Sequence, residues 1–192
     1  MTETVRCLAE ATLVARAQDG DLDSFEVLVR RYQAPIFRLA YRLLSDRDEA
    51  EDATQDTMVQ VWRRLPTLAE PAAFRGWLYR IATRHCTTLL RTRARRRTRP
   101  AEDPTLELGE ALVGGLAGDD PADAAERAGE VEALAAALAE LPEEQRVCWV
   151  LRELHGLSYA EIGYAAHLPQ STVRGRIARA RQSLLRGMAS WR

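Results

Sequence analysis

Apolar side chains recur along this chain with the period of an α-helix in two long segments. Between residues 10 and 99, and again between 131 and 188, they return every three or four positions. This spacing gathers them on one face of a helix, whereas a half-buried strand needs alternation at every second residue. The sequence contains no alternating run of β-branched residues. The pattern therefore predicts an all-α protein.

The residues between these two segments have a different composition. Residues 100–130 are dominated by alanine, glycine, proline and acidic residues, and they show no sustained period. Such a stretch buries too little apolar surface to fold on its own. We therefore predict two small helical domains, at 10–99 and 131–188, joined by a flexible acidic linker at 100–130.

The first segment carries signals for three long helices. Ser24 is a suitable N-cap for the first helix, and Pro35 within its apolar stripe predicts a kink or a break. Ser45 and Asp46 both offer N-caps for the second helix, and Glu49 is placed to close a capping box with Asp46. The third helix is predicted from Phe74 to Leu90.

The second segment ends in a pattern typical of a helix-turn-helix. Ser158 and Glu161 form a capping box at the start of a short helix, and residues 167–169 leave room only for a tight turn. The following helix has a regular apolar stripe, and its other faces are polar or basic. These other faces carry Gln170, Ser171, Thr172, Arg174, Gly175, Arg176, Arg179 and Arg181. Such a second helix enters the major groove of DNA in this motif. The alternative is an ordinary helical hairpin with a solvated arginine face.

Two further surfaces are candidates for binding. The predicted second helix turns acidic and amide groups outward around one apolar residue: Asp48, Asp52, Gln55, Asp56 and Val59. This surface suits a protein partner, although acidic faces are more often simply solvated. On the third helix Tyr79, Arg80 and Thr83 are expected to point outward, and such aromatic and arginine faces suit single-stranded DNA. Phe74 and Trp77 fit a core better.

Composition and charge change this picture little. The net charge is −1, and all 27 basic residues are arginine, which a GC-rich genome would explain as well as DNA binding. The tract at 91–99 is either a phosphate-binding segment or a solvated helix end. Three scattered cysteines and three scattered histidines indicate no disulfide or metal site, so we expect reduced thiols in a cytoplasmic protein. No catalytic pattern, cofactor site or membrane-spanning run is present, so we expect neither an enzyme, nor a small-molecule substrate, nor membrane insertion.

Several stretches, in order and spacing, resemble the extracytoplasmic-function (group 4) sigma factors of the sigma-70 family. They are Ala17–Phe25 (AQDGDLDSF), Ala50–Asp56 (AEDATQD), Trp77–Ala82 (WLYRIA), Leu141–Arg146 (LPEEQR), Gly156–Ile162 (GLSYAEI), Thr172–Arg176 (TVRGR) and Ala178–Arg181 (ARAR). The resemblance covers both periodic segments and leaves out the linker. It implies a sigma-2 domain at 10–99 and a sigma-4 domain at 131–188.

The resemblance also implies partners and roles. The acidic helix would bind the clamp helices of core RNA polymerase, and the linker would run towards the RNA exit path. The third helix would melt and read the −10 element through Trp77, Tyr79, Arg80, Thr83, Arg84 and Arg91. The helix-turn-helix would read the −35 element as duplex. Position along the second helix, apart from the resemblance, gives Arg174 and Arg176 the reach for guanine or phosphate and brings Arg179 and Arg181 to phosphates. We expect Arg176 to read one base pair and Arg181 to bind phosphate. A cognate anti-sigma protein is left open.

Four positions depart from the usual family pattern, and one of them, Met58 in place of a common phenylalanine, is a modest change in the core. Arg84 replaces a common asparagine and Thr88 a common aspartate, so the usual −10 preference cannot be carried over. His167 replaces a common glycine in the turn, where histidine tolerates a left-handed backbone better than most residues. Two alternatives remain: a conventional helix-turn-helix regulator, and a protein that sequesters polymerase without reading promoters.

Overall fold

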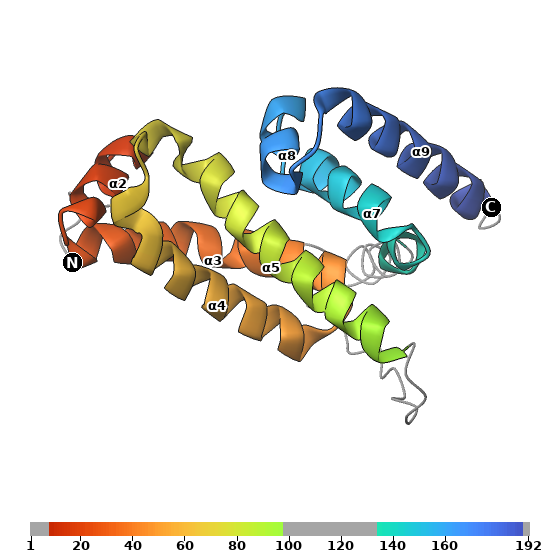
Figure 1. The fold of residues 1–192 in the computed structure, drawn as a ribbon, viewed down its shortest axis with the longest axis horizontal. Coiled ribbons are helices and arrows are strands. Elements are labelled where there is room, and N and C mark those ends of the chain that lie inside the picture. The colour runs from red at the N-terminus through yellow and green to blue at the C-terminus, as the bar shows by residue number, and fades with distance from the viewer. Residues whose placement is uncertain (1–7, 98–133, 190–192) are drawn as a thin grey trace, which may run out of the picture.

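The structure is a computed structural model that describes residues 8–97 and 134–189 (Figure 1). Its elements are α2 (Glu10–Gln18), α3 (Leu22–Leu44), α4 (Arg47–Arg64), η1 (Leu65–Thr67), η2 (Pro71–Ala73), α5 (Phe74–Arg97), α7 (Glu143–Trp149), η3 (Val150–Leu154), α8 (Tyr159–Ala166) and α9 (Gln170–Ala189). Over these two ranges the chain forms helices and turns and no strand, which confirms the all-α prediction. The predicted linker at 100–130 lies outside the described residues.

The long helices α3, α4 and α5 pack against one another to form the N-terminal domain (Figure 1). Their apolar stripes meet in a core in which Leu28, Ile36, Leu39, Leu43, Val61, Phe74 and Leu78 are all buried. The helix α2, which the sequence reading missed, packs on α3. Gln18 at its end donates hydrogen bonds to the carbonyls of Leu65 and Leu68, at 3.0 and 2.7 Å. This helix therefore fastens the segment that connects α4 to α5.

The helix α3 begins earlier than predicted, and Ser24 is not its N-cap. The Asp21 carboxylate accepts hydrogen bonds from the backbone N–H groups of Asp23 and Ser24, at 3.1 and 3.4 Å. The buried Ser24 hydroxyl donates to the same carboxylate at 2.8 Å. A charged carboxylate is the stronger acceptor for N–H groups at a helix start, so the cap lies three residues upstream. The helix also continues through Pro35 without a break, because buried residues on both sides hold it to the core.

The predicted cap of α4 is confirmed, but its capping box is absent. The Asp46 carboxylate accepts from the Glu49 backbone N–H at 2.9 Å. The Glu49 carboxylate does not return to Asp46; it binds Arg93 of α5, at 2.6 Å. A charged partner from another helix thus replaces the local hydrogen bond. The helix α5 extends to Arg97, beyond its predicted end.

The C-terminal domain contains a short helical segment at 134–139, then α7, the π-helix η3, α8 and α9. The capping box of Ser158 and Glu161 opens α8 as predicted. His167 ends this helix in the left-handed conformation, with φ of 59°. The apolar stripe of α9 is buried against the other helices, with Val173 and Ala180 fully inaccessible. These features confirm a helix-turn-helix.

The two domains pack together, with α8 lying on α5 (Figure 1). None of the helices within the described ranges is long and apolar enough to cross a membrane.

Candidate nucleic-acid and polymerase interfaces

The N-terminal part of α9 presents a polar face to solvent. Gln170, Ser171, Arg174 and Arg179 are exposed there, and Thr172 is half-buried beside them. The guanidinium nitrogens of Arg179 lie 3.8 Å from an ideal Cβ position at Gly175, which is an ordinary contact distance. The helix therefore has the exposed polar and basic groups that base edges and phosphates require.

Two other arginines of α9 are engaged by acids of the same domain. Arg176 forms an ion pair and a hydrogen bond with Glu144 of α7, and its side chain is only 17 % exposed. Arg181 donates to Glu153 of η3 at 2.7 Å, and this hydrogen bond raises the pKa of its guanidinium. The sequence placed these two arginines on the flanks of the DNA-reading face, and the structure adds an acidic partner to each.

The outward face of α4 is acidic, as predicted. Its exposed members are Asp48, Asp52, Gln55, Asp56 and Val59. Val59 is 46 % exposed, so an apolar side chain sits in water among carboxylates. Asp56 also approaches His85 of α5, with 3.6 Å between its Oδ2 and Nε2. An exposed apolar residue within a charged rim has the composition of a protein-binding surface.

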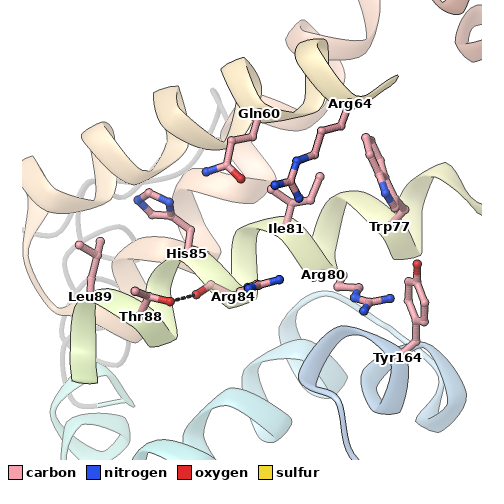
Figure 2. Close-up of a pocket in the computed structure, with 10 residues that line it drawn as sticks. All are labelled: Gln60, Arg64, Trp77, Arg80, Ile81, Arg84, His85, Thr88, Leu89 and Tyr164. Atoms are coloured by element: carbon pink, nitrogen blue, oxygen red, sulfur yellow. Dashed lines mark hydrogen bonds between the residues drawn. The ribbon is translucent and has the colours of Figure 1, made fainter. Parts of the chain in front are cut away.

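A pocket of about 420 Å³ opens between α4, α5 and α8 (Figure 2). Its lining includes three arginines and two aromatic rings: Arg64, Arg80, Arg84, Trp77 and Tyr164. Figure 2 shows the arginine side chains entering it from both α4 and α5. Among the residues that the structure describes, no carboxylate lines the pocket, so its charge suits a phosphate group and its rings suit stacked bases.

The sequence placed three of these residues in one DNA-reading helix, and the structure adds groups from other helices. Trp77, Arg80 and Arg84 were expected to work together. Arg64 of α4 and Tyr164 of α8 join them, although neither was singled out in the sequence. The position of Arg64, a basic residue in the last turn of α4, could have indicated its part in a basic site. No local sequence pattern links Tyr164 to α5.

The expectation that Tyr79 and Thr83 point outward is wrong. Tyr79 is 3 % exposed and Thr83 is 2 % exposed. The Tyr79 hydroxyl is hydrogen-bonded to Nδ1 of His155 at 3.0 Å, and the two rings lie 5.3 Å apart. His155 of the C-terminal domain packs against Tyr79, a contact that the helical period of α5 alone could not reveal.

Further contacts join α5 to the C-terminal domain. Arg75 donates to the carbonyl of His155 and lies 4.0 Å from Glu161. Arg80 lies 2.9 Å from Nε2 of His167, and its guanidinium stacks over the Tyr164 ring at 4.5 Å. These contacts involve Glu161 of the capping box and His167 of the turn. Both predicted DNA-reading elements, α5 and the helix-turn-helix, therefore take part in the domain packing.

Comparison with known proteins accounts for both domains. Residues 28–96 match the family described as Sigma-70 region 2, and residues 131–184 match Sigma-70, region 4. The RNA polymerase sigma-H factor of Pseudomonas aeruginosa is 39 % identical over 176 residues, which cover 90 % of each chain. The ECF RNA polymerase sigma factor SigE of Mycolicibacterium smegmatis is 36 % identical over 91 % of this chain and 65 % of its own length.

The chain belongs to the sigma-70 family of RNA polymerase sigma factors, in its extracytoplasmic-function group. A solved structure of CnrH in complex with the cytosolic domain of CnrY is similar in fold, with a TM-score of 0.68 and 26 % identity. It covers 95 % of this chain and 99 % of its own. As a sigma factor, the protein directs promoter-specific initiation of transcription, with core RNA polymerase and promoter DNA as its partners.

Proposed function

We propose that this sigma factor binds core polymerase through the acidic face of α4. In this proposal α5 reads the −10 element and α9 reads the −35 element. We propose further that the two domains comprise residues 10–99 and 131–188, and that the chain acts in the cytoplasm without catalytic activity. The observation that carries the proposal is that three helices present three separate surfaces: an acidic face on α4, a pocket of arginines and aromatic rings beside α5, and a polar and basic face on α9. The α4 face is acidic, whereas the α5 pocket and the α9 face are basic.

Charge complementarity supports the division of roles. Carboxylates on α4 would repel DNA phosphates, so this face suits a protein partner. The pocket beside α5 combines arginines with aromatic rings, which suits unpaired bases. The α9 face lies at the start of the second helix of a helix-turn-helix, where base edges of duplex DNA are usually met.

The polymerase-binding assignment is tested by reversing charge on α4. In Asp52→Arg with Asp56→Arg we expect co-purification with core polymerase to fall at least tenfold. Both side chains are exposed, so the thermal unfolding midpoint should stay close to that of the wild type. Asp23→Arg with Glu26→Arg on α3 makes the same change of charge at exposed positions and serves as the control. Equal binding of core polymerase by both double variants would refute the assignment.

An anti-sigma partner is the remaining part of the proposal. It is supported by the similarity in fold to a sigma factor RpoE solved with the anti-sigma factor NepR from Bartonella quintana, at a TM-score of 0.68 and 22 % identity. The packed arrangement of α5 and α8 would give such a partner a single surface to hold.

A further inference from the structure

The arginines of α9 divide into two classes by the partners that they have. Arg176 and Arg181 are ion-paired with Glu144 and Glu153. The carboxylate neutralises the charge of the guanidinium and occupies one of its terminal nitrogens, so the ion pair competes with binding to a guanine edge or a phosphate. Both pairs join α9 to the helices behind it, so they hold the helix in place within its domain.

Arg174 has a different environment. It is exposed, and it has no ion pair with any described residue. Its guanidinium carbon lies 5.3 Å from the centre of the Tyr159 ring. A guanidinium that lies over an aromatic ring is attracted to it without an N–H hydrogen bond, so its N–H groups stay free to donate. Those N–H groups are the ones that bind O6 and N7 of guanine in pairs.

The Tyr159 ring is itself held in place. Tyr159 is the first residue of α8, directly after the capping box at Ser158. A second guanidinium, that of Arg152, lies 4.7 Å from the centre of its ring. Arg152 is fixed in turn by a 2.8 Å hydrogen bond to the carbonyl of Leu157. A side chain with few accessible orientations loses less entropy when it binds, so an arginine resting on a fixed ring is prepared for recognition.

We propose that Tyr159 positions Arg174 to read one base pair of the −35 duplex. Tyr159 is then a positioning residue for promoter specificity. Sequence position gave both Arg174 and Arg176 the reach for guanine and favoured Arg176 as the base reader, and this inference assigns that role to Arg174. This inference rests on the proposed assignment of the −35 element to α9.

The test is transcription from a library with every −35 sequence, using holoenzyme assembled from the full chain and core polymerase. Arg174→Ala should reduce the preference at one base pair by about tenfold. Tyr159→Leu should reduce the preference at the same base pair, whereas Tyr159→Phe keeps the ring and should preserve it. Adding Tyr159→Leu to Arg174→Ala should change the preference no further, because the ring acts through the arginine. Arg176→Ala tests the other candidate base reader and should not alter the preference at the base pair that Arg174 reads. Arg186→Ala, at an exposed position further along α9, is the matched control and should leave base preference unchanged.

Tyr159 is half-buried, so its loss could also weaken the fold. Tyr159→Met, which keeps an apolar side chain of considerable length without a ring, is therefore tested beside Tyr159→Leu, and thermal unfolding is measured for each variant. The positioning role is overturned if a folded Tyr159→Leu or Tyr159→Met variant lowers transcription from all sequences alike or shifts a different base pair. A library in which Arg174→Ala, Arg176→Ala and Arg179→Ala all keep the wild-type −35 preference would overturn the assignment of α9 as well.

Discussion

Two glycines of the helix-turn-helix have opposite steric surroundings. A Cβ added at Gly163 would lie 2.7 Å from the carbonyl oxygen of Leu168, which is backbone and cannot move without opening the turn. A Cβ added at Gly175 would meet only the Arg179 guanidinium, at an ordinary 3.8 Å. Gly163 thus permits the close approach of the turn to α8, whereas Gly175 only lowers the stability of the helix that contains it.

We therefore expect opposite effects on stability from the same substitution. Gly163→Ala should lower the free energy of unfolding by about 1–3 kcal/mol, since it overpacks a rigid contact. Gly175→Ala should raise it by up to about 1 kcal/mol, because alanine is the better helix former. Urea unfolding followed by circular dichroism measures both. Destabilisation of similar size in the two variants would contradict the steric interpretation of Gly163.

At the level of elements, one arginine from the tract at the end of α5 joins three helices. Arg93 donates to the carbonyl of Leu44 at the end of α3, at 2.8 Å. It also pairs with Asp46 and Glu49 at the start of α4, at 3.4 and 2.6 Å. Its side chain is 29 % exposed, so solvent weakens these pairs only in part. This tract was expected either to bind phosphate or to form a solvated helix end, and Arg93 does neither in this structure.

Arg93→Ala should therefore lower the free energy of unfolding by about 1–2 kcal/mol, because it leaves a carbonyl and two carboxylates with fewer partners. Arg91 lies two residues away, is exposed, and serves as the control. Arg91→Ala should leave stability within about 0.5 kcal/mol of the wild type. Thermal unfolding of the two variants tests this prediction. An equal change in the unfolding midpoint of both would show that Arg93 has no special structural role.

At the scale of the whole molecule, we expect one histidine to make the packing of the two domains sensitive to pH. His155 contacts Tyr79 across the boundary, and its Nε2 is buried without a hydrogen-bond partner among the described residues. Burial, with the charges of Arg38 and Arg75 nearby, lowers its pKa to about 4. A histidine in water has a pKa of about 6.5, so packing favours the neutral ring. The stabilisation is complete above pH ~6.5 and is lost progressively as the pH falls towards 4.

The radius of gyration, measured by small-angle X-ray scattering, should therefore increase when the pH falls from 7.5 to 5. His155→Gln cannot gain a proton and should abolish most of this change. If the variant expands with pH as the wild type does, other titrating groups control the packing. In the packed state Tyr79 is covered, so its use in reading the −10 element requires the domains to separate.

Local sequence determined the helices and the helix-turn-helix of this protein. The capping box at Ser158, the left-handed turn at His167 and the stripe through Val173 all involve residues within a few positions of one another. The helical period of α4 likewise predicted that its acidic residues face solvent. Short-range hydrogen bonds and a 3.6-residue period can be read from one segment, and these features were accordingly predicted in advance.

Only the tertiary structure decided which polar groups find partners. Glu49 binds Arg93, 44 residues away, rather than closing its own capping box. Arg176 binds Glu144, 32 residues away, and Tyr79 meets His155 of the other domain. A helical pattern shows that a face is polar, but water, another helix or DNA can each satisfy such a face. The choice depends on residues distant in the chain, because a long-range ion pair forms only after the helices that carry it have packed.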